Sequence, residues 1–390
     1  MAATTCHMQY LSPTPGEITL MAFSPATGND GMTSTLCQEL RRCRFNSATA
    51  EVPAAKVAET LQNCLGAGIR PFLSPTSNRL TPTIWNNFLS FCDSLRPNLQ
   101  NAIGGWMLKS GATLGDVSSS STLSNCVSIF RNYDNTRSTS ASLLSLPLFI
   151  SALSLNAVSG SSSETNYRTY LEGFLENLTP SFWPFIPFST DLRLSSLLTS
   201  YYREFEIFSL MARYTGTPMW AYVKCLTASA SGAVPQTTSA NLRCAAFSAL
   251  AYGAQGLVWW TYRSQESGGT TYNGLVDATG NKTTLWNMVQ KINTEVSALN
   301  TVLCGCQLVG CRHTGTTHYD YTCQLDGEFG PLKSITTGSQ GVLVSHLCNK
   351  GTDYLMVVSH PTTATQTISL EFNPYWTVSQ LSVSDSGVLS

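Results

Sequence analysis

The chain has 390 residues, of which 43% are hydrophobic and 12% are charged, and its formal net charge is −1. This length allows one large domain or two ordinary ones, and the hydrophobic share is sufficient for a full core. A net charge so close to zero provides no electrostatic basis for binding nucleic acid, so we expect no nucleic-acid partner.

The composition favours an extracellular or cell-surface protein. Charged residues are about half as frequent as usual, and serine and threonine take their place. The 13 cysteines indicate disulfides in an oxidising compartment, and their odd number leaves one free or bonded to another chain. The first 20 residues show no signal-peptide pattern, and the most apolar run, 143–155, is too interrupted to span a membrane.

Strand-like and helix-like segments alternate regularly from residue 17 to residue 303. The eight strand-like segments are 17–23, 45–52, 70–73, 102–108, 143–149, 182–188, 219–225 and 256–262. The helix-like segments that follow them are 34–44, 54–65, 82–95, 119–132, 164–178, 194–214, 239–252 and 283–302. This order predicts an α/β fold of the (β/α)8 TIM-barrel type. An open doubly wound sheet fits less well, because no glycine-rich phosphate turn follows the first strand.

The clearest single unit runs from Ser239 to Arg263. Apolar residues recur at helical spacing in its first half, and Gly253 and Gly256 end that helix. The run from Gly256 to Tyr262 is continuously apolar, as expected for a strand that is buried on both faces of a parallel sheet.

The pattern changes after Val302. Short alternating stretches at 342–347, 354–358, 367–372 and 376–378 are separated by turns and predict a small antiparallel β-sandwich. We therefore divide the chain into a leader segment (1–16), a barrel (17–303) and a C-terminal β-sandwich domain (304–390).

Aromatic residues are frequent in the predicted strands four, six, seven and eight. TIM barrels carry their functional sites at the C-terminal ends of the strands. Flat aromatic faces beside polar groups suit sugar rings, which have apolar faces and hydroxylated edges. The predicted ligand-binding residues are Trp106, Trp183, Trp220, Tyr222, Trp259, Trp260, Tyr262 and Arg263.

Few acidic residues stand near the ends of the predicted strands. Glycoside hydrolysis requires two carboxylates about 5–9 Å apart. The fallback candidates for that role are Glu51, Asp116, Asp191 and Glu266. All five histidines lie outside the barrel segment, which excludes a Ser-His-Asp device or a three-histidine metal site within it. We expect no cofactor.

Four cysteines cluster at the predicted domain boundary, at positions 304, 306, 311 and 323. Their spacing does not match that of a zinc site. We therefore predict that Cys304, Cys306, Cys311 and Cys323 form disulfides that fasten the barrel to the C-terminal domain, and we predict no metal site.

Five motifs carry a resemblance to a known family: ELRRCRFN (39–46), GGWMLK (104–109), YYREFEIF (201–208), PMWAY (218–222) and ALAYGAQGLVWWTY (249–262). They resemble motifs of TIM-barrel glycoside hydrolases of the β-galactosidase-like type, especially secreted barrel-plus-sandwich members from gut Bacteroidetes. The resemblance covers most of the chain.

The positions that carry catalysis in this family differ here. The resemblance implies an Asp-Glu-Pro motif after the fourth strand, but this chain has Ser110, Gly111 and Ala112. It also implies an aspartate before Tyr-Pro after the sixth strand, where this chain has Trp183 and Pro184. None of these side chains exchanges a proton as an acid/base would. We therefore predict a barrel that has lost hydrolysis and binds glycan at its mouth.

Two alternatives stay open. One is a structural, self-assembling filament or surface-layer protein, in which the cysteines and the uncharged surface support homo-oligomers. The other is an active glycosidase with displaced carboxylates. Carbohydrate is a possible small-molecule partner, and no membrane span is expected.

Overall fold

The computed structural model describes residues 14–26, 30–76, 80–138, 146–153, 158, 164–178, 197–228, 237–267, 269–315, 322–338, 341–360 and 366–381. Its main element is a parallel sheet of seven strands. In chain order they are β1 (Thr19–Ala22), β2 (Ser47–Glu51), β3 (Arg70–Ser74), β4 (Gly105–Ala112), β5 (Leu148–Ala152), β6 (Trp220–Lys224) and β8 (Gly256–Trp260).

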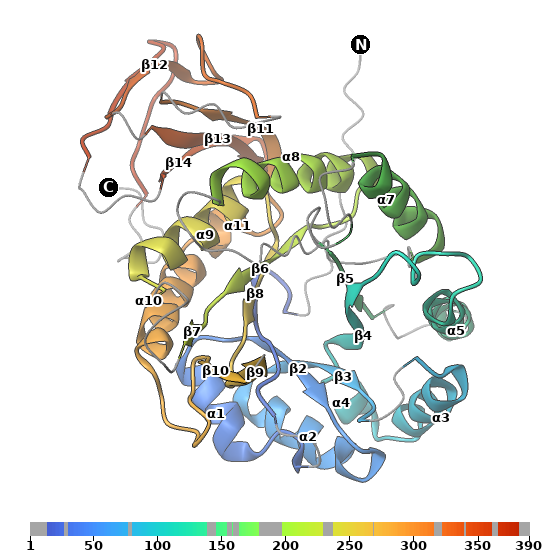
Figure 1. The fold of residues 1–390 in the computed structure, drawn as a ribbon. Helices are drawn as coiled ribbons and strands as arrows, with labels where there is room; N and C mark the ends of the chain where they lie inside the picture. The colour runs from blue at the N-terminus through green and yellow to red at the C-terminus, as the bar shows by residue number, and fades with distance from the viewer. Residues whose placement is uncertain are drawn as a thin grey trace.

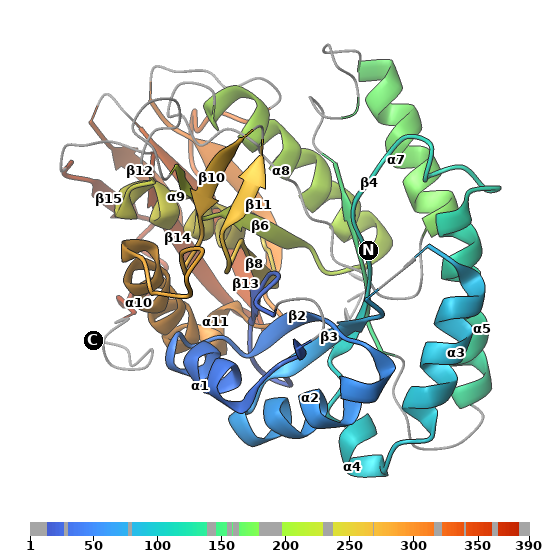
Figure 2. The ribbon, with the colours of Figure 1, turned by 60° about the horizontal axis from the view of Figure 1, so that its bottom comes forward.

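The sheet is curled like part of a barrel, with the first and last strands side by side. Its order is β5-β4-β3-β2-β1-β8-β6, and every pairing between neighbours is parallel. Figures 1 and 2 show the strands at the centre and the helices around them. The α/β, TIM-like architecture predicted from the sequence is confirmed, with seven strands observed. The predicted sixth strand, 182–188, lies outside the described residues.

Helices connect the strands along the outside of this curled sheet. They are α1 (Ser34–Arg42), α2 (Ala54–Ala67), α3 (Pro82–Asp93), α4 (Pro97–Gln100), α5 (Thr122–Ser138), α7 (Glu164–Leu178), α8 (Leu197–Thr215), α9 (Ser239–Ala251), α10 (Thr284–Ala298) and α11 (Asn300–Leu303). Their buried faces and the outer face of the sheet form one continuous hydrophobic core. Within the described part of the chain, no helix is both long and apolar enough to cross a bilayer.

A second, smaller core fills the inside of the curled sheet. Because strand side chains alternate between the two faces, every second residue points inward. The buried inward residues are Met21, Phe72, Met107, Phe149, Trp220, Tyr222 and Val258. The barrel interior is therefore packed by side chains rather than open, as in TIM barrels generally.

A short antiparallel sheet follows the C-terminal ends of β6 and β8. It consists of β7 (Thr227–Ala228), β9 (Gln265–Ser267) and β10 (Thr270–Asn273), in the order β7-β10-β9. The sequence pattern did not predict this sheet, since its strands are too short to show a period.

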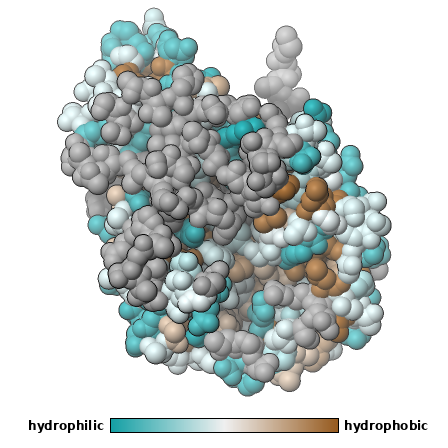
Figure 3. Space-filling model, viewed as in Figure 1, coloured by the Kyte–Doolittle hydropathy of each residue, from teal (hydrophilic) through white to brown (hydrophobic). Residues whose placement is uncertain are grey.

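The C-terminal part consists of small antiparallel sheets. Strands β11 (Gln307–His313), β13 (Val342–Asn349) and β14 (Thr352–Ser359) form one sheet, and β12 (Leu332–Thr336) pairs with β15 (Ser369–Phe372). The strand predicted at 376–378 is wrong: these residues form no strand, and the Trp376 side chain is 44% exposed. In the space-filling view this part presents mainly hydrophilic surface, whereas hydrophobic residues appear on the opposite flank, near α5 and α7 (Figure 3).

Helix α9 joins the two parts of the molecule. It packs against β6 on the barrel side and against β13 and β14 on the other. Nine of its residues are buried, which accounts for a sequence rich in alanine and poor in charge. At its C-terminal end the Ala251 carbonyl accepts a hydrogen bond of 2.5 Å from the Ser345 hydroxyl.

Candidate functional site at the barrel mouth

A small cavity lies at the C-terminal end of the parallel strands, where TIM-like folds carry their sites. Its volume is about 130 Å³. The residues that line it come from the loop after β1, from β2 and from β4: Phe23, Ser24, Ala26, Thr49, Glu51 and Met107.

Strand β2 contributes the polar wall of the cavity. Ala48 and Ala50 belong to the core between the sheet and the helices. Alternation therefore turns Thr49 and Glu51 inward, and both line the cavity. Glu51 is the only acidic residue in the seven described strands of the parallel sheet.

The loop after β1 is fixed over the cavity by hydrogen bonds from two other segments. The Ser24 amide donates to the Thr49 hydroxyl at 2.8 Å. The Arg263 Nε donates to the Pro25 carbonyl at 2.6 Å, and the Thr261 hydroxyl donates to the Phe23 carbonyl at 3.2 Å. Ser24 has a φ of 53°, a left-handed conformation that is rare for serine and concentrated at functional sites.

Hydroxyl groups lie next to this cavity inside the barrel. The Tyr222 hydroxyl is 2.9 Å from the Ser110 hydroxyl, and the Tyr222 ring meets the Phe23 ring edge-on at 5.6 Å. The Ser151 hydroxyl accepts a hydrogen bond of 2.5 Å from the Gly111 amide. Burial raises the pKa of Tyr222 far above its usual value, so its hydroxyl stays protonated and able to donate at neutral pH.

Three of the predicted ligand-binding aromatics face the barrel interior. Tyr222 lies beside the cavity wall, as just described. Trp260, the last residue of β8, is half-buried against the inner core. Trp220 faces inward too, but it is the first residue of β6 and packs against Gly256 at the N-terminal end, away from the mouth. Trp183 lies outside the described residues.

Three other predicted aromatics point to the outer side of the sheet. The Trp106 ring packs against Trp85, with centroids 6.4 Å apart. The Trp259 indole donates to the Asn293 side chain at 2.9 Å, and Tyr262 belongs to the same outer core. All three are at most 3% exposed. They support the fold and do not line the cavity, so the ligand-binding role predicted for them does not fit their burial.

The Arg263 side chain is bound to the protein backbone. Its side chain is half-buried, and its Nε holds the Pro25 carbonyl of the cavity loop. It therefore contributes to the site by fixing the loop.

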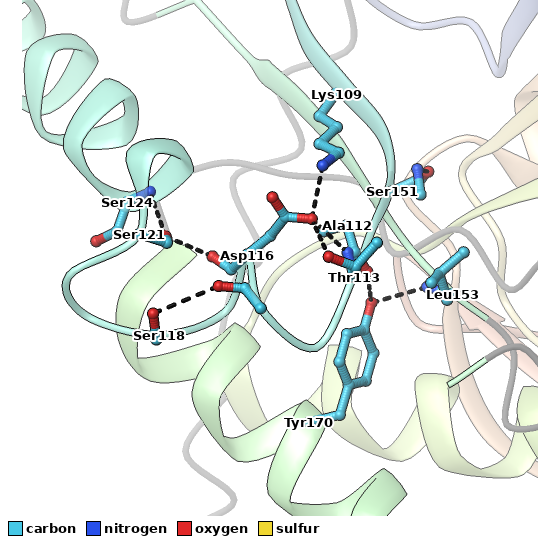
Figure 4. A network of polar contacts seen from close by, with 12 residues as sticks. Lys109, Ala112, Thr113, Asp116, Ser118, Ser121, Ser124, Ser151, Leu153 and Tyr170 are labelled. Atoms are coloured by element: carbon cyan, nitrogen blue, oxygen red, sulfur yellow. Dashed lines mark hydrogen bonds and ion pairs between the residues drawn. The ribbon is translucent and has the colours of Figure 1, made fainter. Parts of the chain in front are cut away.

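Among the four candidate carboxylates, Asp116 is engaged in a loop network (Figure 4). Its Oδ2 accepts from the Lys109 ammonium at 2.6 Å and from the Thr113 amide at 2.7 Å. Burial would raise the pKa of Asp116, but the bonds from Lys109 and Thr113 outweigh it and hold the pKa below its ordinary value. In the same network, the Tyr170 hydroxyl donates to the Ala112 carbonyl at 2.7 Å. Asp116 thus shapes the turn after β4.

The other candidate carboxylates have different positions. Glu266 is exposed on β9, in the short antiparallel sheet. Asp191 lies outside the described residues. Of the four, Glu51 is the one that the structure places in the cavity.

The structure forms no disulfide among the four cysteines for which disulfides are predicted. Cys304, Cys306, Cys311 and Cys323 each carry a thiol there. Cys311 is buried and directs its sulfur to the Ala251 carbonyl at 3.4 Å, whereas Cys323 is exposed. Within the described ranges, no cluster of three metal-ligating side chains occurs.

No family model and no curated protein sequence matches this chain. Solved structures with a similar course of the chain include a β-galactosidase from Marinomonas ef1, with a TM-score of 0.45 and 10% identity over 72% of this chain and 60% of that one. An endo-β-1,4-mannanase from Thermotoga petrophila has a TM-score of 0.46 and 10% identity over 88% of this chain and 97% of its own length. A β-galactosidase from Halorubrum lacusprofundi has a TM-score of 0.45 and 10% identity over 73% of this chain and 58% of its own length.

The chain thus spans 60% of the length of the Marinomonas enzyme. It shows distant structural similarity to TIM-barrel glycoside hydrolases, and no subtype is identified. At this identity the similarity concerns the fold and implies no activity.

Proposed function

We propose that the protein binds a carbohydrate at the barrel mouth and does not hydrolyse it. One observation carries the proposal: Glu51, Thr49 and Phe23 line the same small cavity. A carboxylate and a hydroxyl suit the hydroxylated edge of a sugar, and an aromatic ring suits its apolar face.

The number of carboxylates on the described strands argues against hydrolysis. Both retaining and inverting glycosidases use two acidic groups on either side of the scissile bond. The seven described strands offer Glu51 alone, and Asp116 is held by Lys109 and Thr113. A single carboxylate anchors a sugar hydroxyl but does not supply both the acid and the nucleophile or base.

The size of the cavity limits the ligand. At about 130 Å³ it is smaller than the roughly 300–1,000 Å³ typical of drug-sized ligands. It therefore suits one terminal sugar unit, with the remainder of an oligosaccharide outside. The hydrogen bonds that fix the loop at Ser24 and Pro25 reduce the entropy lost on binding.

Calorimetric titration with a panel of neutral oligosaccharides tests this proposal. We expect Glu51→Gln and Phe23→Ala to weaken binding of whichever sugar binds wild type by tenfold or more. Glu59→Gln is the matched control, because Glu59 is exposed on α2 and pairs with Lys56. Equal affinity in wild type and both cavity variants would rule out this site.

An activity assay separates binding from hydrolysis. Chromogenic glycosides incubated with the wild-type protein should release no chromophore above the level of the Glu51→Gln variant. Turnover that disappears in Glu51→Gln would instead identify an active glycosidase and overturn the non-catalytic part of the proposal.

A further inference from the structure

Two buried thiols from neighbouring helices touch each other on the outer side of the barrel. The Sγ of Cys37 on α1 lies 3.6 Å from the Sγ of Cys64 on α2. Both side chains are 0% exposed. We propose that Cys37 and Cys64 are a disulfide site, which closes when the chain folds in the presence of a small-molecule disulfide. This inference does not depend on the proposed carbohydrate site.

Two hydrogen bonds beside the pair hold the segment before α1 against α2. The Met32 amide, just before α1, donates to the Thr60 hydroxyl of α2 at 3.2 Å. The Asn63 side chain, next to Cys64, donates to the Met32 carbonyl at 2.9 Å. These bonds hold the two helices together, so the sulfur atoms need to approach by only about 1.6 Å to reach the S–S bond length of about 2.05 Å.

The two thiols differ in acidity once the fold has formed. The hydrogen bond from Cys64 lowers the pKa of Cys37, although burial opposes it. The same bond, together with burial, raises the pKa of Cys64. In the folded protein Cys37 is therefore the more acidic thiol of the pair. By contrast, burial raises the pKa of Cys126 on α5 to about 11.

The chemistry balances with oxidised glutathione as the oxidant. Before the helices pack and bury the pair, the Cys37 thiolate attacks one sulfur of the glutathione disulfide, forms a mixed disulfide and releases one glutathione thiolate. Cys64 then loses its proton and attacks the Cys37 sulfur, which releases the second glutathione. The two protein thiols are oxidised by two electrons, and their two protons end on the two glutathione molecules.

Refolding in a glutathione buffer tests the site on the full chain. The reduced, denatured chain is refolded with excess oxidised glutathione, its free thiols are alkylated after denaturation, and its peptides are analysed by mass spectrometry. We expect one linked peptide pair joining Cys37 to Cys64, 2 Da lighter than the two reduced peptides together. The closed loop should raise the Tm by about 2–5 °C over the reduced protein.

Three variants serve as comparisons. Cys37→Ala and Cys64→Ala should each remove the linked pair and the oxidant-dependent rise in Tm, whereas Cys126→Ala should retain both. The peptide analysis of wild type needs no variant to fold. Complete alkylation of Cys37 and Cys64 after oxidative refolding, or a bridge from either residue to another cysteine, would overturn the proposal.

Discussion

The Tyr252 hydroxyl at the end of α9 lies 2.9 Å from Nε2 of His313 on β11, across the boundary between the barrel and the C-terminal sheets. The same hydroxyl donates to Oε1 of Glu206 at 2.9 Å, and Nδ1 of His313 lies 3.2 Å from Nε2 of His360. A phenol has one proton. If it is given to Glu206, His313 donates through Nε2 and accepts from His360 through Nδ1.

This buried hydrogen-bonded network predicts that the protein loses stability at acidic pH. Burial and the neighbouring His360 lower the pKa of His313 to about 3. An unfolded imidazole with a pKa of about 6.5 gains a proton as the pH falls below that value, while the folded one does not. The unfolded state then binds more protons, so the free energy of unfolding decreases between about pH 6.5 and pH 3. From pH 7 to pH 5 we expect a loss of about 2 kcal/mol from this residue.

Urea denaturation at several pH values measures this effect as the difference between wild type and His313→Gln. The difference separates the effect of His313 from that of Glu206. Burial raises the pKa of Glu206, so protonation of this carboxyl increases the free energy of unfolding as the pH falls, opposite to the effect of His313. The other charged or titratable groups that surround this hydrogen-bonded network are the same in both proteins: Tyr202, Arg213, Cys311 and Arg312. His346→Gln, at the half-buried pair with Asp353, is the control. Identical pH slopes in wild type and His313→Gln would refute the assignment.

A second prediction concerns the packing of the barrel interior. A methyl group on Gly256 would lie 2.6 Å from the Trp220 ring. Gly256→Ala should therefore lower the free energy of unfolding by about 1–3 kcal/mol, through overpacking. In a Trp220→Leu background Gly256→Ala should cost less than it does in wild type, because the leucine leaves room for the methyl group.

Gly66→Ala is the control for Gly256→Ala. Gly66 lies in α2 with nothing within 4 Å of the added methyl. Alanine favours a helix more than glycine does, so this variant should be about 0.5–1 kcal/mol more stable. Denaturation curves that show the same change for both variants would contradict the packing argument.

A third prediction separates Asp116 from Glu51. Removing the Asp116 carboxylate leaves the Thr113 amide and the Lys109 ammonium without their shared acceptor. Asp116→Ala should cost about 1–3 kcal/mol of stability and leave carbohydrate affinity within twofold of wild type. Glu51→Gln should instead weaken carbohydrate binding and leave the free energy of unfolding nearly unchanged. A double-mutant cycle with Lys109→Met gives the coupling of the ion pair, and a coupling of zero would argue against the network.

The order of strands and helices could be predicted because each unit carries its own local signals. The stretch from Ser239 to Arg263 shows this well. Its helical spacing, its glycines and its apolar run correspond to α9 and β8, within two residues at each end. The barrel alternation follows from such units without any long-range information.

The direction of individual side chains could not be predicted in the same way. Trp259 and Trp260 are adjacent in a continuously apolar strand, so the pattern does not show which one faces the interior. Pairing with β1 and β6 decides this, and Trp259 points outward. The contact between Cys37 and Cys64 is equally invisible, because it depends on how α1 packs on α2.

The last prediction concerns the boundary at residue 303/304, which the sequence suggests as a domain border. Asn349, at the end of β13, is 6% exposed. Its side-chain amide donates to the Val302 carbonyl at 2.7 Å and to the Cys304 carbonyl at 3.1 Å. Because the bond to Val302 crosses the proposed border and α9 is packed against both parts, we expect the two parts to unfold together. Near-UV circular dichroism and tryptophan fluorescence should then report one transition.

Asn349→Ala leaves those buried carbonyls without their donor. The whole transition should move to lower denaturant concentration, with a loss of about 1–3 kcal/mol. Asn373→Ala is the matched control, because the Asn373 side chain donates to the exposed Glu328 at 3.4 Å, so its loss should change stability by less than about 0.5 kcal/mol. Two separate transitions in wild type, or a shift in only one spectroscopic signal for Asn349→Ala, would mean that the barrel and the C-terminal sheets are independent folding units.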